Sequence, residues 1–288
     1  MDQALQALHD APNTMVMGVL NITEDSFSDG GKWLDPQAAA EHGHALAKAG
    51  AQIIDIGAES TRPGAKRVVS EQDELNRVLG AVHALADTGV PLSIDTTRAS
   101  VAEAALEAGA SIINDVSGGR LDPQVPHVVA EHDCLYIVQH WRGWLSGSQG
   151  ATPDADTSVY AGGVMHDVCE ELLRQVDDVL AAGVRPEQII IDPGLGFSKP
   201  SAAHNFPLLV GLDTLRASGY PVLIGASRKR FLADAGIDAG NMAARDDATA
   251  ALSAMCAEHG AWAVRVHDVA KSLAAVTMGT MWRTYANA

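Results

Sequence analysis

The sequence predicts an α/β fold, a closed (β/α)8 TIM barrel formed as a single domain by residues 1–288, with residues 1–13 as an N-terminal extension. Strand and helix patterns alternate along the chain, and this alternation predicts a parallel sheet. Eight strand–helix units fit within 288 residues, which favours a closed barrel over an open doubly wound sheet. No Ser/Gly-rich linker or block of charge divides the chain, so we expect one domain.

The joints between helices and strands share one local pattern. An Ala-rich amphipathic stretch ends in Gly, and a β-branched run follows. The pattern occurs in KAGAQIIDIG (48–57), EAGASIINDVSGG (107–119), AAGVRPEQIIIDPG (181–194) and EHGAWAVRVHD (258–268). Glycine suits the left-handed position that ends a helix, and short Ile/Val runs suit strands that are buried on both faces. These joints therefore predict helix-to-strand turns within a parallel sheet.

Taken in order, the β-branched runs and the amphipathic stretches predict eight strands and eight helices. The predicted strands are 14–20, 52–57, 91–95, 111–115, 134–139, 188–192, 221–226 and 262–266. The predicted helices are 36–49, 70–87, 98–108, 123–132, 163–182, 201–218, 228–259 and 267–285. We expect the seventh helix to break near Gly236–Gly240.

The predicted loops differ in length. Those after strands one, two and five are long (21–35, 58–69 and 140–162) and rich in Gly, Ser, Pro and Asp, whereas the joints before strands are short. A barrel carries its active site on the loops at the carboxyl ends of its strands. We therefore expect the functional residues at that end.

The chain is strongly acidic, with a formal net charge of −16 and a pI near 4.9. Such a chain is repelled by nucleic acid and by anionic membranes, so we expect neither as a partner. The three cysteines lack CxxC spacing, which fits a reducing compartment. The N-terminal residues lack the pattern of a signal peptide, and no apolar run reaches membrane-spanning length. These features together predict a cytoplasmic protein.

Polar residues at the predicted strand ends form the candidate site. They are Asn21, Asp55, Glu59, Asp95, Asn114, Asp115, His140, Asp192, Ser227, Lys229, Arg265 and His267. Carboxylate and amide groups can hydrogen bond to the edge of a heterocycle, and Arg, Lys and His can bind an anion. This combination suits a substrate with a polar ring and a phosphate. Single residues have simpler explanations, because Asp95 could cap a helix and Asp192 could form a turn.

Two basic segments are candidates for anion binding. GASRKRFL (225–232) follows a buried strand and opens a predicted helix, whose N-terminus attracts anions. The alternative for Arg228 and Arg230 is a solvated basic patch. RVHDV (265–269) places Arg265 and His267 on the same side of a strand end. The chain contains neither GxxxxGK[ST] nor GxGxxG, which argues against P-loop and Rossmann folds.

The ordered motifs MGVLNITEDSFSDGG, ESTRPGA, SIDTTR, INDVSGG, HWRG, DPGLGFSK, GASRKRF and RVHDV resemble the dihydropteroate synthases of the bacterial folate pathway over about residues 14–285. The resemblance implies a TIM-barrel transferase that condenses 6-hydroxymethyl-7,8-dihydropterin pyrophosphate with p-aminobenzoate. The products are 7,8-dihydropteroate and pyrophosphate. It also implies Mg²⁺ as cofactor, a homodimer, and two small-molecule substrates, of which p-aminobenzoate is the one that sulfonamides mimic.

The resemblance assigns roles to matching residues. It assigns pterin binding to Asp95, Asn114, Asp192 and Lys229, and it assigns a catalytic role as well to Asp95, Asp192 and Lys229. Pyrophosphate binding falls to Asn21, Thr61, Arg62, Arg265 and His267, with Asn21 also near the metal. p-Aminobenzoate binding falls to Phe27, Phe197 and Ser227, and the first mobile loop contributes Asp25 and Asp29.

One residue departs from the family pattern, and two other functions compete. Family members commonly carry Met before the His of the HxxG motif, where this chain has Gln139. A methyltetrahydrofolate methyltransferase would share the pterin residues but would not need the SRKR or NITEDSFSDGG segments. A non-catalytic paralogue would be expected to have lost loop residues that this chain keeps.

Overall fold

Eight parallel strands form one sheet in the order β6-β5-β4-β3-β2-β1-β8-β7 in the computed structural model, which describes residues 2–23, 35–59, 69–143 and 157–286. The strands are β1 Met15–Asn21, β2 Ile53–Gly57, β3 Leu92–Asp95, β4 Ile112–Asp115, β5 Leu135–Gln139, β6 Ile189–Asp192, β7 Leu223–Ile224 and β8 Ala263–Val266. A parallel bridge between Ile191 and Val222 joins β6 to β7. The sheet therefore closes on itself, and the predicted (β/α)8 barrel is confirmed.

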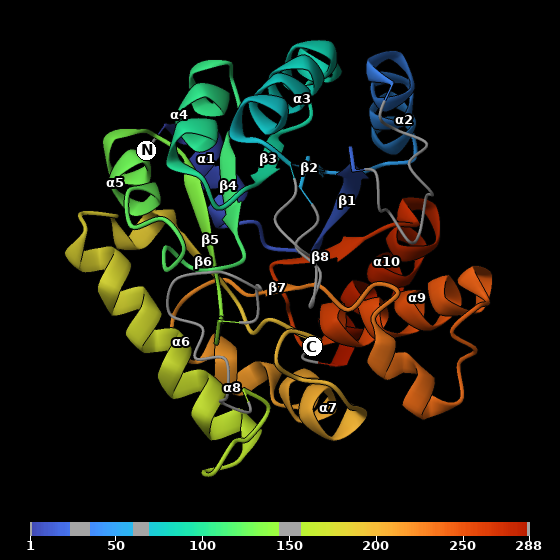
Figure 1. Ribbon diagram of the computed structural model, residues 1–288. Coiled ribbons are helices and arrows are strands. Elements are labelled where there is room, and N and C mark those ends of the chain that lie inside the picture. The colour runs from blue at the N-terminus through green and yellow to red at the C-terminus, as the bar shows by residue number, and fades with distance from the viewer. Residues whose placement is uncertain (1, 24–34, 60–68, 144–156, 287–288) are drawn as a thin grey trace.

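Helices surround the ring of strands (Figure 1). They are α1 Gln3–His9, α2 Pro36–Lys48, α3 Glu71–Leu85, α4 Ala99–Glu107, α5 Val125–Glu131, α6 Val164–Ala181, α7 Ala202–Val210, α8 Leu212–Arg216, α9 Met242–Glu258 and α10 Val269–Ala286. Short 3-10 segments are Ala86–Thr88, Pro186–Gln188 and Arg230–Ala235. Among the described residues, no helix is both long and apolar enough to cross a bilayer.

The amino-terminal end of the barrel is filled by apolar side chains. Inward-pointing residues from the first positions of the strands, such as Met15, Ile53 and Leu135, pack into one buried cluster. Helix α1 covers this end, because Leu5 joins the cluster and the Leu8 carbonyl accepts a 2.9 Å hydrogen bond from Trp262 Nε1. The predicted N-terminal extension is thus a helix packed on the barrel. With the lower barrel filled, room for a ligand remains at the carboxyl ends.

Two predicted helices were wrong in detail. The stretch 201–218 is divided into α7 and α8 at Gly211, where a side chain would meet Met165 and the Pro207 carbonyl. The stretch 228–259 breaks at Gly236, as expected, but its first part, Arg230–Ala235, is 3-10 rather than α-helical. Glycine lowers helix propensity at both breaks, and Gly236 adopts a left-handed conformation with φ +81°.

Candidate active site

A cavity of about 510 Å³ opens at the carboxyl ends of the strands. Of the predicted strand-end set, Asp55, Asp115 and His140 do not line it, whereas every residue that the resemblance assigned a role and that the structure describes does. These residues are Asn21, Asp95, Asn114, Asp192, Phe197, Ser227, Lys229, Arg265 and His267. The other predicted residues, Asp25, Phe27, Asp29, Thr61 and Arg62, lie outside the described residues, so their roles stay predictions.

Strand register explains why residues far apart in sequence meet here. Asp95 of β3 lies beside Asn114 of β4, and Gln139 of β5 lies beside Asp192 of β6. Side chains alternate between the two faces of a strand, so residues two apart along each strand share the barrel interior. The last inward positions of the strands are therefore polar, above the apolar layer that fills the barrel.

Asp55 is the centre of the polar layer; it belonged to the predicted strand-end set, but the resemblance assigned it no role. Its side chain is fully buried. Its carboxylate accepts hydrogen bonds from Ser93 Oγ at 2.6 Å, from Asn114 Nδ2 at 3.2 Å and from Arg265 Nε at 2.5 Å. Asp55 thus fixes the orientation of two predicted site residues. Its inward position on β2, two residues before Gly57, was the available sequence signal.

Asp95 offers an acceptor to the cavity. Arg265 Nη2 donates to its Oδ2 at 3.1 Å, whereas Oδ1 is buried and receives no hydrogen bond from the residues that the structure describes. Burial raises the pKa of Asp95 to about 7, with Arg265 opposing the shift and the nearby Asp55 adding to it. A helix cap is the wrong explanation for Asp95, because α4 begins after Arg98 and Asp122 accepts from the Ala99 amide.

Asp192 forms a turn and also faces the cavity. Its Oδ1 accepts a 2.7 Å hydrogen bond from the Gly194 amide, which confirms the turn that its Asp-Pro-Gly sequence suggested. The residue lines the cavity with 4% of its surface exposed. Burial raises its pKa, while the Gly194 hydrogen bond and the cations Lys229 and Lys199 oppose the shift. The carboxylate is therefore held in place by the backbone and set among cations.

The basic segment after β7 is built differently from the prediction. Lys229 lies with its Nζ 4.0 Å from the ring centroid of Phe197, so a cation and an aromatic face meet at the cavity. Arg228 donates to Asp246 through Nε at 2.7 Å and Nη2 at 2.9 Å, so it is not part of a solvated patch. Ser227 does not stand at an α-helix N-terminus, because the 3-10 segment Arg230–Ala235 follows and α9 begins only at Met242.

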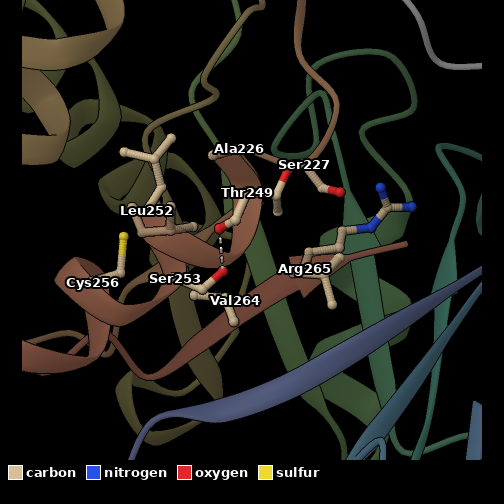
Figure 2. Close-up of a pocket in the computed structure, with 10 residues that line it drawn as sticks. Ala226, Ser227, Thr249, Leu252, Ser253, Cys256, Val264 and Arg265 are labelled. Atoms are coloured by element: carbon tan, nitrogen blue, oxygen red, sulfur yellow. Dashed lines mark hydrogen bonds between the residues drawn. The ribbon is translucent and has the colours of Figure 1, made fainter. Parts of the chain in front are cut away.

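Ser227 and His267 are held together at the cavity edge. Ser227 Oγ lies 2.9 Å from His267 Nδ1 and accepts from the His267 amide at 3.2 Å. Figure 2 shows Val264 turned toward α9 and Arg265 turned away from it, as the alternation along β8 requires. Arg265 and His267 both line the cavity, as predicted, but each is already paired with side chains of the protein.

Gln139 and Lys199 also line the cavity and were not predicted as site residues. Gln139 is buried, and its Nε2 donates to the Val116 carbonyl at 3.3 Å. The amide that replaces the family's usual Met is therefore oriented by the backbone. Lys199 closes the DPGLGFSK motif; the motif was recognised, but burial of its lysine does not follow from the sequence.

The barrel and its strand-end cavity define the class: an α/β-barrel enzyme whose ligand site combines buried carboxylates with cations. A family model described as pterin binding enzyme matches residues 17–267, so the chain belongs to the pterin-binding enzyme family. Within that family it is similar to the dihydropteroate synthase of Mycobacterium leprae, with 48% identity over 271 residues covering 93% of each chain.

Solved structures agree with this relationship. The dihydropteroate synthase of Yersinia pestis in a sulfonamide complex superposes with a TM-score of 0.84 at 34% identity, covering 95% of each chain. That of Xanthomonas albilineans with 4-aminobenzoic acid has a TM-score of 0.81 at 36% identity, covering 96% of this chain and 94% of that one.

Proposed function

We propose that this chain is a dihydropteroate synthase, a transferase that condenses 6-hydroxymethyl-7,8-dihydropterin pyrophosphate with p-aminobenzoate to give 7,8-dihydropteroate and pyrophosphate. One observation carries the proposal: nine residues that sequence motifs assign to this reaction line a single cavity. The relationship to dihydropteroate synthases over 93% of the chain supports it.

The pterin end of the site comprises Asp95, Asn114, Asp192 and Lys229. A pterin ring carries N–H donors on one edge, and the open Oδ1 of Asp95 suits such a donor. When the C–O bond to pyrophosphate breaks, positive charge develops on the pterin methylene and spreads over the ring. The carboxylates of Asp95 and Asp192 stabilise that charge, because they are preorganised in a buried site.

The p-aminobenzoate end comprises Phe197 and Ser227, and Lys229 of the pterin end contacts the Phe197 ring. The Phe197 face packs on the aminobenzoate ring, and Ser227 contacts its carboxylate. The amine attacks the pterin methylene, forms the new C–N bond and then loses its proton. No covalent enzyme intermediate is required. The Xanthomonas albilineans relative was solved with 4-aminobenzoic acid, which supports such a pocket in the fold.

Pyrophosphate binds at the cationic end, through Asn21, Arg265 and His267. The donor set suits Mg²⁺, because the metal binds through one or two protein oxygens plus substrate phosphates and keeps several waters. Asn21 would supply an amide oxygen at the cavity, and bound Mg²⁺ would neutralise charge on the leaving pyrophosphate. Thr61 and Arg62 would add donors to the pyrophosphate, whereas Asp25, Phe27 and Asp29 belong to the first loop.

The enzyme is a homodimer in this proposal, and it acts in the cytoplasm as a single domain. Helix α10 carries exposed Met278, Met281, Trp282 and Tyr285 at helical spacing, and Met255 of α9 is also exposed. These side chains share the outer face of two helices that pack closely, since Gly279 lies against the Ala254 carbonyl. An exposed apolar face of this kind suits a second copy of the chain.

A turnover assay with both substrates and Mg²⁺ tests the function. We expect release of pyrophosphate that depends on p-aminobenzoate and is inhibited by a sulfonamide. A methyltetrahydrofolate methyltransferase would instead transfer a methyl group, and a non-catalytic paralogue would bind the pterin without turnover. The absence of p-aminobenzoate-dependent pyrophosphate release would reject the proposal.

A further inference from the structure

Lys199 is a buried lysine whose three nearest partners are all acceptors. It is 1% exposed, and its Nζ lies 2.9 Å from His140 Nδ1, 3.1 Å from the Gly194 carbonyl and 3.1 Å from the Phe197 carbonyl. An ammonium has three N–H donors, so the three acceptors match it. Two of them belong to the loop that presents Phe197 to the cavity.

His140 connects Lys199 to Glu171 of helix α6. Burial, together with the adjacent Lys199, lowers the pKa of His140 to about 3, so its ring is neutral. Because Nδ1 accepts from Lys199, the ring proton lies on Nε2, which donates to Glu171 at 2.9 Å. Arg142 then holds Glu171 with two hydrogen bonds, at 2.7 and 2.6 Å.

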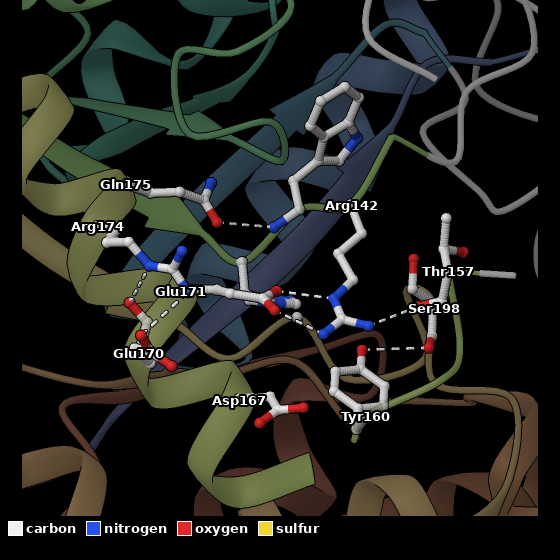
Figure 3. Close-up of polar contacts among 12 residues, drawn as sticks. Arg142, Thr157, Tyr160, Asp167, Glu170, Glu171, Arg174, Gln175 and Ser198 are labelled. Atoms are coloured by element: carbon white, nitrogen blue, oxygen red, sulfur yellow. Dashed lines mark hydrogen bonds and ion pairs between the residues drawn. The ribbon is translucent and has the colours of Figure 1, made fainter. Parts of the chain in front are cut away.

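The contacts return to the loop and form a closed ring. The guanidinium of Arg142 stacks 3.8 Å from the centroid of the Tyr160 ring, and Tyr160 donates to the Ser198 carbonyl at 3.2 Å (Figure 3). Ser198 is the neighbour of Lys199 in the chain. The ring Lys199–His140–Glu171–Arg142–Tyr160–Ser198 therefore ties the loop after β6 to β5 and α6. We call these six residues the strut.

The loop needs such support because its backbone is strained. Gly194 and Gly196 have positive φ values of 67° and 77°, and Ser198, which is not glycine, has φ 53°. A non-glycine residue in this region carries an energetic cost that the surroundings must offset. Phe197 lies between Gly196 and Ser198, and its ring contacts the Lys229 ammonium. We therefore expect a change at the strut to displace Phe197 in particular.

We propose that Lys199 is a positioning residue for p-aminobenzoate, which acts by fixing Phe197. The inference rests on the proposed function of the cavity. Lys199 makes no direct contact with the substrate in this role. The pterin end of the site depends on it less, because Asp95 and Asn114 are fixed by Asp55 and Arg265 instead.

The charge state of Lys199 gives the proposal a distinct signature. Burial lowers the pKa of Lys199 to about 7. Below that pH the ammonium serves all three acceptors, and above it the neutral amine has only two N–H donors. The charged groups facing it are Asp192, Arg142, Glu171 and Lys229, and His140 stays neutral. We therefore expect kcat/KM for p-aminobenzoate to fall as the pH rises through about 7.

The test compares steady-state kinetics of the wild type, Lys199→Met, Tyr160→Phe and Lys271→Met. Lys271 is an exposed lysine that pairs with Asp247, so its variant controls for loss of a surface charge. For Lys199→Met we expect the KM for p-aminobenzoate to rise roughly tenfold, the size of one lost aromatic contact. The KM for the pterin substrate should change less than about threefold, and the alkaline fall in kcat/KM should disappear.

Tyr160→Phe removes one hydroxyl at the opposite side of the strut and keeps the ring stacked on Arg142. It should raise the KM for p-aminobenzoate about twofold to threefold. If Lys199→Met fails to fold, the result for this variant tests the proposal instead. An unchanged KM for p-aminobenzoate and an unchanged alkaline limb in the folded Lys199 variant would overturn the proposal.

Failure of the proposed function is distinguished from failure of this inference, because it would appear as a lack of turnover in the wild type itself. In that case, calorimetric binding of p-aminobenzoate and amide exchange of residues 194–199 test the role of Lys199 without catalysis. Faster exchange and weaker binding in Lys199→Met, but not in Lys271→Met, support it. Equal exchange and equal binding in both variants overturn it.

Discussion

Arg265 and Asp55 form an ion pair in the middle of the barrel, with Arg265 Nε 2.5 Å from Asp55 Oδ2. Asp55 is fully buried, and Arg265 is the only cation in contact with its carboxylate among the described ion pairs. Arg265 also reaches Asp95 at 3.1 Å. This arginine therefore neutralises two buried acids, a role distinct from its predicted contact with pyrophosphate.

Arg265→Ala should lower the free energy of unfolding by about 3–5 kcal/mol, because it leaves buried charge without a partner. Chemical denaturation at neutral pH measures this change. The matched control is Arg265→Ala combined with Asp55→Asn, which removes both charges and should recover part of the loss. A stable single variant with a raised KM for the pterin substrate would show that pyrophosphate binding is the main role of Arg265.

Asp95 gives the pterin half of the reaction a pH dependence. Its pKa is raised to about 7, so in the free enzyme this carboxylate becomes protonated and loses its charge as the pH falls below that value. We expect kcat/KM for the pterin substrate to fall about tenfold per pH unit well below pH 7. Asp95→Asn should be much slower and should lack this acid limb. The expected titration of Asp95 covers about pH 5 to 7. If kcat/KM of the wild type for the pterin substrate is flat over this range, the assignment is contradicted.

Asp192→Asn preserves the shape of the side chain and its turn but removes the charge. Because the carboxylate is expected to stabilise positive charge that develops on the pterin, kcat should fall more than binding of the pterin substrate weakens. We expect a loss of about 100-fold in kcat/KM, as for removal of one electrostatic group from a preorganised site. Steady-state kinetics and calorimetry separate the two effects, and an unchanged kcat/KM would remove Asp192 from the mechanism.

The fold could be predicted well from local sequence because its signals are local. Glycine followed by a β-branched run marked the joints before β2, β4, β6 and β8, and each of these strands begins one residue after the predicted start. The failures lie where tertiary contacts decide. Gly211 divides a helical pattern because Met165 packs against it, and residues after β7 form a 3-10 segment although their sequence suits a helix.

The site could be predicted where a strand end marks it, as for Asp95, Asn114 and Asp192. Partner choice could not, because it depends on which side chains meet across the barrel. Asp55 binds Arg265 over a sequence separation of 210 residues, and Lys199 binds His140 over 59. No local sequence pattern distinguishes a cationic side chain that binds a substrate from one that neutralises a buried acid.

Glu171 gives the strut a measurable dependence on acid. Burial alone would raise its pKa, but the hydrogen bonds from His140 and Arg142 lower it to about 2 from a usual value of 4.5. Between these values the unfolded chain binds more protons than the folded one, so the contribution of Glu171 is complete above pH 4.5 and is lost as the pH falls toward 2. Glu171→Gln should therefore cost about 1–2 kcal/mol near neutral pH, allowing for solvent at this partly exposed carboxylate, and progressively less in acid.

Urea unfolding of the wild type and the variant across the acid range measures that difference. The matched control is Glu170→Gln: this neighbouring residue is exposed and reaches Arg174 at 3.4 Å on the same helix (Figure 3). Exposed ion pairs of this kind contribute little to the free energy of unfolding. The control should therefore differ from the wild type in this free energy by less than about 0.5 kcal/mol at every pH. If the two variants lose the same stability, or if the loss in Glu171→Gln does not shrink below pH 4.5, the ion pair with Arg142 does not hold the strut to α6.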